Sequence, residues 1–242
     1  MRIQKYLAQH GYGSRRAIEE MIQQKRIRVN GQIIQLGYLY QHGDQIEIDQ
    51  RLVTTHQPSQ HQCLIYHKPV GVLCSRQDAS GHPLVFDHLP KLSGTRWVMV
   101  GRLDLNTSGI LLFTTDGDLA YRLMHPKFSV VRVYQVRVFG KVTPQQILAI
   151  EQGLELTDGP VQVESIKRLT PSQQNKINQW FEVVIAEGRN RVVRRLFEYF
   201  GHQVSQLIRK QYADIRLPDQ LNQGQWQYLT AQQKERLYAN YA

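Results

Sequence analysis

The stretch Gly101-Arg102-Leu103-Asp104-Leu105-Asn106-Thr107-Ser108-Gly109 is a polar, turn-forming segment between two apolar runs, residues 97–100 and 110–113. Asp, Asn, Thr, Ser and Gly bond locally to the backbone or tolerate unusual dihedral angles, so the segment is typical of a loop. The flanking runs favour burial, and we expect them to be strands that hold the loop rigidly. Catalytic groups are often placed on such loops, and this one carries a single carboxylate, Asp104.

Length and composition indicate a globular protein of one large or two smaller domains. The chain has 242 residues, of which 41% are hydrophobic, enough to form a core. It contains no apolar run near the roughly 20 residues of a membrane span, and Met1 leads into Arg2 without the apolar stretch of a signal peptide. We therefore expect a cytoplasmic protein, in which Cys63 and Cys74 are thiols, because their spacing fits neither a metal site nor a disulfide scaffold.

The charge balance predicts a polyanionic partner. The formal net charge is +10 and the pI is about 9.7, and without a lipid-anchor signal we expect nucleic acid rather than a membrane. The first 43 residues carry seven basic side chains against two acidic ones, which indicates a phosphate-binding surface. A solvated basic face is the alternative. The seven basic residues are Arg2, Lys5, Arg15, Arg16, Lys25, Arg26 and Arg28.

Residues 1–48 are predicted to form a small αα-β unit. Apolar residues at helical spacing predict a first helix, and Ser14 is placed to cap a second one. Residues 26–29 and 46–48 alternate as strands, and Asn30-Gly31 is a strong hairpin signal. Residues 49–61 are polar and lack an apolar period, so we expect a linker there, followed by a second domain at residues 62–242.

The second domain mixes strand and helix patterns. Strands are expected at residues 64–66, 131–139, 161–169, 180–185 and 212–217, with a polar run at 171–176. Short helices are expected at 119–124, from Thr143 to Gly153, after Asn190 as a cap, and after Thr230, which opens a capping box with Gln233. This pattern predicts an α+β fold with a largely antiparallel mixed sheet flanked by helices.

Four arginines occur within seven residues of the segment Glu187-Gly188-Arg189-Asn190-Arg191-Val192-Val193-Arg194-Arg195. On a helix facing only water such a cluster would repel itself. It is favourable if an anion or a buried carboxylate lies opposite, although arginine-rich helix faces are also often simply solvated.

The N-terminal unit resembles the S4 RNA-binding domain. The resemblance lies in the opening Arg2-Ile3-Gln4-Lys5-Tyr6-Leu7, the turn Gly13-Ser14-Arg15-Arg16 and the ending Ile27-Arg28-Val29-Asn30-Gly31. It implies binding to structured RNA without specifying a reaction.

The string from Gly101 to Gly117 resembles the catalytic motif of pseudouridine synthases. Tyr66-His67-Lys68-Pro69-Val70-Gly71 resembles the first motif of that family, Arg132-Val133-Tyr134-Gln135-Val136 its tyrosine strand, and the arginine-rich segment its third motif. An S4 unit ahead of these motifs marks the branch that modifies ribosomal RNA. Arg122-Leu123-Met124-His125-Pro126 and Ile177-Asn178-Gln179-Trp180 resemble the enzymes of that branch that act on 23S rRNA of the large subunit.

The resemblance implies a reaction that breaks the N-glycosidic bond of a uridine and rejoins the uracil to ribose through carbon 5. It implies no cofactor, metal or membrane, a monomer, and 23S rRNA as partner, either naked or in an assembling large subunit. Asp104 would be the essential carboxylate, acting by covalent addition or by removal of a ribose proton. Tyr134 would stack on a flipped base, and Arg194 would be the cationic partner of Asp104. Arg102 and Arg191 would contact RNA. Many relatives have His-Gln where this chain has Arg191-Val192, which leaves open which arginine faces the carboxylate.

Two other readings fit parts of the sequence. A non-catalytic S4-type rRNA-binding or ribosome-assembly protein would leave the central loop without a purpose. An S4-linked RNA methyltransferase would need a glycine-rich loop between a strand and a helix. The nearest match, Gly11-Tyr12-Gly13, lies between two predicted helices.

Overall fold

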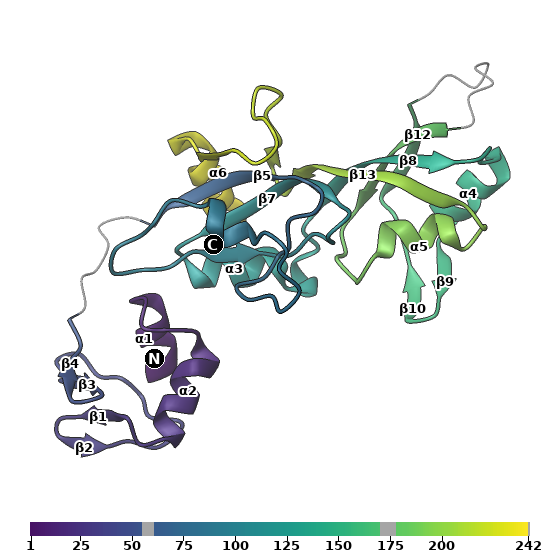
Figure 1. Ribbon diagram of the computed structural model, residues 1–242. Helices are drawn as coiled ribbons and strands as arrows, with labels where there is room; N and C mark the ends of the chain where they lie inside the picture. The colour runs from purple at the N-terminus through teal and green to yellow at the C-terminus, as the bar shows by residue number, and fades with distance from the viewer. Residues whose placement is uncertain (55–60, 170–177, 242) are drawn as a thin grey trace. The chain divides into compact units, whose positions relative to one another are not determined.

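The computed structural model describes residues 1–54, 61–169 and 178–241, which fall into two compact units (Figure 1). The smaller unit comprises Met1–Gln62 with the short segments Pro90–Val98 and Thr115–Gly117, and the larger unit comprises the rest. Among the described residues, every helix is too short or too polar to cross a bilayer. The expected polar run at 171–176 lies outside the described residues.

The smaller unit contains two helices and a four-stranded sheet. Helix α1 spans Ile3–Gln9 and α2 spans Arg15–Gln23. The sheet has the order β2-β1-β3-β4, with bounds β1 Ile27–Val29, β2 Gln32–Ile33, β3 Ile46–Ile48 and β4 Arg51–Leu52. The predicted cap is confirmed, because the Ser14 side chain accepts a hydrogen bond from the Ala17 amide at 3.0 Å. The hairpin turn is confirmed as well, since Asn30 and Gly31 both have positive φ.

The segment expected to be a linker is partly structured. Strand β4 lies within it and pairs with β3, whereas residues 55–60 lie outside the described part of the chain. The core of the smaller unit is aliphatic, built from the inward faces of both helices and the sheet. The basic side chains of this unit lie mostly on its surface.

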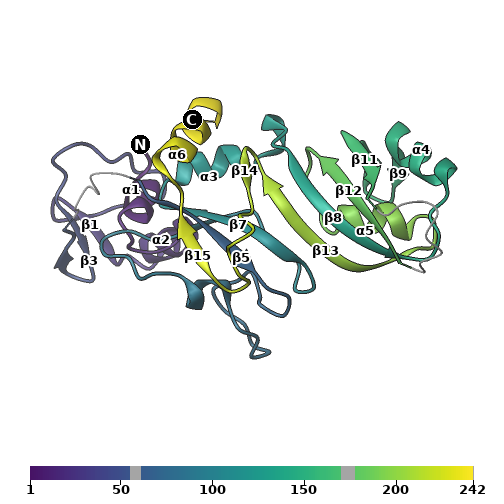
Figure 2. The same cartoon turned by 90° about the horizontal axis from the view of Figure 1, so that it is seen from above.

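The larger unit is built on a nine-stranded mixed sheet with the order β11-β12-β8-β13-β7-β5-β15, to which β14 adds beside β13 and β6 beside β7. Figure 2 shows β8, β12 and β13 side by side, continuing the sheet beyond β5 and β7. The bounds are β5 Cys63–Lys68, β6 Val98–Val100, β7 Ser108–Thr114, β8 Arg132–Phe139, β11 Ser165–Arg168, β12 Asn178–Ile185, β13 Gln203–Tyr212, β14 Ile215–Arg216 and β15 Trp226–Tyr228.

Strand β13 connects the two halves of this sheet. It pairs in parallel with β7, whereas its partners β8 and β14 are antiparallel to it. The parallel contact brings Gly109 against Arg209 so closely that a Cβ atom on Gly109 would lie 2.2 Å from the Arg209 carbonyl oxygen. Only glycine fits there, which fixes the start of β7 and hence the end of the loop before it.

Helices and one separate hairpin complete the larger unit. Helix α5, Val192–Glu198, packs on β13, and the hairpin of β9, Leu154–Leu156, and β10, Gly159–Val161, lies next to α5 (Figure 1). The other helical segments are 3-10 turns η1 Val85–His88 and η2 Pro126–Phe128, and helices α3 Gly117–Met124, α4 Pro144–Gln152 and α6 Ala231–Tyr241. The capping boxes at Thr143 and Thr230 are both formed, and the predicted α+β class is confirmed.

Strand β13 was not predicted before residue 212, and three local predictions are wrong. The strand expected at 161–169 is divided between β10 and β11, and the strand expected at 212–217 is interrupted by a turn at 213–214. The cap of α5 was expected at Asn190. The capping position is instead Arg191, which has left-handed φ of 52° and makes no side-chain capping bond. Asn190 lines a pocket.

Candidate active site

The loop between β6 and β7 is held from behind by three buried cations. Lys68 Nζ donates to the carbonyl oxygens of Thr107 at 2.9 Å and Leu105 at 3.4 Å. Arg194 Nη2 donates to the carbonyl oxygen of Asn106 at 2.8 Å. Arg209 Nη1 donates to the carbonyl oxygen of Arg102 at 3.4 Å, and its Nε donates to Ile110 at 2.9 Å. The loop is therefore fixed through its backbone.

Asp104 is not needed to close the turn in which it lies. Its backbone carbonyl accepts the hydrogen bond from the Thr107 amide at 3.0 Å, so the turn is closed by main-chain atoms. Within the described residues, no group donates a hydrogen bond to the Asp104 carboxylate and no cation forms an ion pair with it. An aspartate in such a turn usually serves as a local backbone cap, and here the carboxylate is left free for other work.

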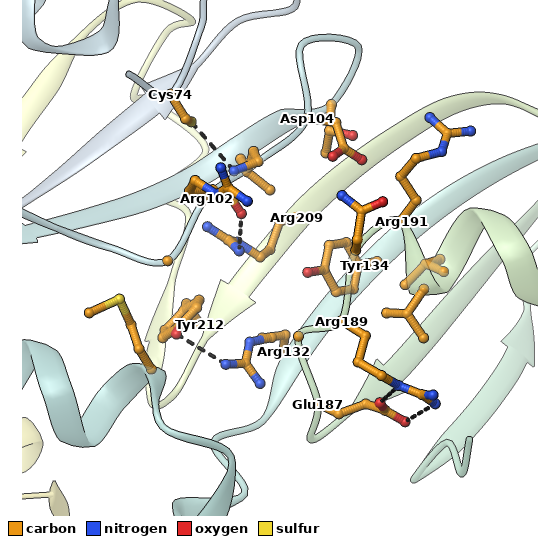
Figure 3. Close-up of a pocket in the computed structure, with 18 of the residues that line it drawn as sticks. Cys74, Arg102, Asp104, Arg132, Tyr134, Glu187, Arg189, Arg191, Arg209 and Tyr212 are labelled. Carbon is orange, nitrogen blue, oxygen red and sulfur yellow. Dashed lines mark hydrogen bonds and ion pairs between the residues drawn. The ribbon is translucent and has the colours of Figure 1, made fainter. Parts of the chain in front are cut away.

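The Asp104 side chain faces a pocket of about 960 Å³ (Figure 3). Two acidic residues line it, and the second, Glu187, is engaged by Arg189. Five arginines also line it, namely Arg102, Arg132, Arg189, Arg191 and Arg209. The pocket is thus strongly cationic, and Asp104 is an acidic side chain in it that forms no ion pair within the described residues. Such a cavity favours a substrate that carries phosphates.

Tyr134 lies on β8 and contributes to the same pocket. Its neighbours across the sheet are Val183 and Arg209, and 8% of its surface is exposed. Figure 3 shows the ring below Asp104, in the same cavity. The structure therefore brings Asp104 and Tyr134 together in one cavity.

Arg194 takes a different position from the one predicted. It is buried on α5 behind the loop, where it donates to Val204 at 3.0 Å and Asn106 at 2.8 Å through their carbonyl oxygens. Burial is the main cause that lowers the pKa of Arg194, the charge of Arg191 lowers it further, and Asp104 raises it. The guanidinium thus contacts the backbone that carries Asp104 and not, in the described structure, its carboxylate.

Arg191 and Arg102 reach the pocket from opposite elements. Arg191 begins α5 and forms an ion pair with Glu198 at 3.0 Å. Arg102 is exposed on the loop itself, two residues before Asp104. Both side chains line the pocket.

Sequence reasoning missed Arg209, Arg132 and Lys68 as site residues. Arg132 donates to Val130 at 2.7 Å and to the Tyr212 hydroxyl at 3.2 Å, and the Nη2 atom of Arg209 has no hydrogen-bond partner among the described residues. Lys68 is fully buried, and burial lowers its pKa to about 8. Lys68 ends β5, Arg132 begins β8, and β13 is mostly polar around Arg209, so no local pattern distinguished these cations from surface residues.

The basic residues predicted to bind RNA in the N-terminal unit are mostly on its surface. Arg2, Arg15, Arg16, Lys25, Arg26 and Arg28 are exposed, and Lys5 is half-buried. Arg26 is already paired with Asp49 through two hydrogen bonds of 2.6 and 2.7 Å. Its charge is therefore less available to a phosphate than those of Arg15 and Arg16 on α2.

Comparison with known proteins places these features in a family. The sequence pattern of RNA pseudouridylate synthases matches residues 62–199, and that of the S4 domain matches residues 1–46. The chain belongs to the RNA pseudouridylate synthase family. This pseudouridine synthase is 50% identical over 229 residues to the ribosomal large subunit pseudouridine synthase B of Escherichia coli K12, covering 93% of this chain and 78% of the relative. The corresponding protein of Yersinia pestis is 49% identical, with 93% and 71% covered.

The fold agrees with that assignment. A crystal structure of a pseudouridylate synthase superposes with a TM-score of 0.67 at 25% identity, covering 98% of this chain and 99% of the other. An S4 domain followed by a pseudouridine synthase domain is therefore the architecture of this enzyme, which is an isomerase.

Proposed function

We propose that this pseudouridine synthase converts one uridine of 23S rRNA, in the large ribosomal subunit, to pseudouridine. The large-subunit enzymes named above support the substrate, since they are identical to this chain at about half of the aligned positions, which cover 93% of this chain. The observation that carries the proposal is the carboxylate of Asp104, held on a backbone-anchored loop in a cationic pocket next to Tyr134.

In the proposed reaction the bond between ribose C1′ and uracil N1 breaks, and a bond between C1′ and C5 forms. The proton leaves C5 and N1 gains one, so no redox change or external group is required. Asp104 is the group that begins the reaction, either by adding covalently to the sugar or base, or by taking a ribose proton.

The other side chains have supporting roles in this proposal. Tyr134 stacks on the extruded uracil and holds it while the base turns. Arg194 keeps the loop in place and contributes positive potential near Asp104. Arg102 and Arg191 bind the phosphates on either side of the target nucleotide.

We also infer that residues 1–48 form an S4 domain that binds rRNA, that residues 49–61 link it to the catalytic domain at 62–242, and that the enzyme acts as a cytoplasmic monomer. The exposed basic side chains of α2 support the binding role, because RNA affinity depends largely on contacts to phosphates.

The test is conversion of a single uridine in unmodified 23S rRNA by the purified enzyme. Asp104→Asn removes the charge at nearly constant size, and we expect it to abolish conversion while RNA binding stays within about twofold. Asp219→Asn, the same change at a fully exposed aspartate, is the matched control and should leave conversion intact. Substantial conversion by Asp104→Asn would overturn the assignment of the carboxylate, and the absence of conversion by the unaltered enzyme would overturn the function.

A further inference from the structure

Three aromatic rings form a cluster at the end of α3, next to the pocket, which we call the α3 aromatic cluster: Tyr121, His125 and Phe128. The ring centroids of Tyr121 and His125 are 4.9 Å apart. Phe128 meets both rings edge-on, at 6.4 Å from Tyr121 and 6.2 Å from His125. Half of the Tyr121 surface nevertheless remains exposed, so the cluster supports the tyrosine without covering it.

The cluster is continuous with the mouth of the active-site pocket. Met124, His125 and Pro126 line that pocket, and they lie within the same turn as the three rings. Met124 is also exposed. An RNA strand whose target nucleotide occupies the pocket would therefore pass over or beside these rings.

Hydrogen bonds connect the end of α3, which carries the cluster, to residues that line the pocket. The Tyr212 hydroxyl donates to the carbonyl oxygen of Leu123 at 2.8 Å and accepts from Arg132 Nη2 at 3.2 Å. The His125 ring is held by the Lys127 amide, which donates to its Nδ1 at 3.3 Å. The position of the rings is thus coupled to two residues that line the catalytic cavity.

The charges around the cluster are those of a nucleic-acid site. Arg122 and Lys127 are exposed beside the rings, and the Lys127 ammonium lies 4.7 Å from the centre of the Phe128 ring. An exposed aromatic ring flanked by cations is the arrangement on which unpaired bases stack while their phosphates are neutralised. A protein partner or a lipid surface would not account for its continuity with a cavity lined by five arginines.

We propose that Tyr121 is a stacking site for an unpaired nucleotide of the substrate RNA adjacent to the target uridine, with Lys127 contacting its phosphate. The inference rests on the proposed function and adds a second base-binding position outside the catalytic pocket. It makes the enzyme sensitive to whether the nucleotide beside the target is unpaired, and so contributes to the choice of site.

The test uses fragments of 23S rRNA that the enzyme converts, with 2-aminopurine placed in turn at each unpaired position beside the target uridine. Stacking on Tyr121 should quench the fluorescence at one of these positions. In Tyr121→Ala the quenching should be lost and KM should rise about fivefold or more, since stacking on an aromatic side chain is worth roughly that factor or above. Tyr121→Phe keeps the ring and should restore both readouts.

Tyr199→Ala is the matched control, because Tyr199 is similarly exposed but lies at the end of α5, where neither it nor its chain neighbours line the pocket, whereas Tyr121 is one turn from the lining residues Met124 and His125. It should leave quenching and KM unchanged. Thermal unfolding separates a structural role, because a ring that only supports the end of α3 would lower Tm without changing KM. Unchanged KM and quenching in Tyr121→Ala, with conversion still present, would overturn this inference alone. Failure of the unaltered enzyme to form pseudouridine would overturn the proposed function and this inference with it.

Discussion

Replacing Gly109 with alanine adds a single carbon atom and should strongly lower the free energy of unfolding of this protein. Gly109 has φ of +114° and pairs with Arg209 across the parallel contact of β7 and β13. An added Cβ would lie 2.2 Å from the carbonyl oxygen and 2.5 Å from the amide nitrogen of Arg209, whereas ordinary contacts begin at 3.4 Å. The two strands would have to separate by about 1 Å, because the obstructing atoms belong to the backbone and not to a flexible side chain.

The expected cost combines two effects. Holding a non-glycine residue in this region of φ costs about 1–3 kcal/mol, and forcing apart packed strands costs about 1–3 kcal/mol more. A total of about 4 kcal/mol is a large share of the 5–15 kcal/mol that stabilises a typical domain. At about 2–4 °C per kcal/mol for a unit of this size, Tm should fall by about 8–16 °C.

The assay is thermal and chemical unfolding of Gly109→Ala next to Gly224→Ala. Gly224 also has positive φ, +83°, but a Cβ there would meet nothing within 4 Å. The control should therefore lose only about 1 kcal/mol, the cost of the backbone conformation. If the two variants differed by less than 1 kcal/mol, the close approach of β7 and β13 would not constrain the fold as described, and the position of the loop would need another explanation.

Three further outcomes follow from the buried and exposed cations. Burial lowers the pKa of Lys68 to about 8, so above pH 8 the unfolded chain binds more protons than the native protein. The free energy of unfolding of the wild type minus that of Lys68→Met should therefore increase by about 1 kcal/mol per pH unit between about pH 8 and 10. Urea unfolding measures this difference, and a flat or falling value would contradict the prediction. Arg194→Ala should cost about 3 kcal/mol or more and lower kcat, because two buried carbonyl oxygens lose their donor; unfolding and single-turnover rates at saturating RNA check it, and an unchanged kcat would remove Arg194 from the site. Replacing Arg15 and Arg16 together with glutamine should reduce the salt dependence of RNA binding by about one unit of slope for each lost contact, and an unchanged slope would show that α2 is not the RNA-binding face. Arg26→Gln should change the slope little, since Asp49 already pairs with that charge.

Many helices, strands and turns of the fold could be predicted from short stretches of sequence. Capping residues and the turn at Asn30 and Gly31 act over a few positions, so their signals are complete within the sequence. The alternation of β8 was equally clear and correctly predicted a strand at residues 131–139.

Strand β13 was missed because two bulges break its period. Its buried residues are Val204, Leu207, Arg209 and Tyr212, at spacings of three, two and three, and the register shifts where the strand irregularities occur. Each bulge shifts the alternation of inward and outward side chains by one residue, so the sequence shows no continuous strand pattern. The most important strand for the site is therefore the one with the weakest pattern.

The buried cations could not be distinguished from surface residues by periodicity either. Lysine and arginine are mostly exposed, and nothing local shows that Lys68 or Arg209 will meet the carbonyl oxygens of a loop that is distant in the sequence. Family resemblance identified Asp104, Tyr134 and Arg194 as a set, but the contact of Arg194 with the loop backbone emerged only in three dimensions.

The loop that carries Asp104 is held by hydrogen bonds to its backbone carbonyl oxygens. Every peptide unit has such an oxygen, whatever its side chain. Leu105 and Asn106 can therefore be exchanged for other residues without altering what Lys68 and Arg194 hold. The surface that meets the RNA is thereby separated from the machinery that keeps the carboxylate in place. Such a division lets the choice of nucleotide sequence drift, or be redesigned, while the chemistry stays where it is.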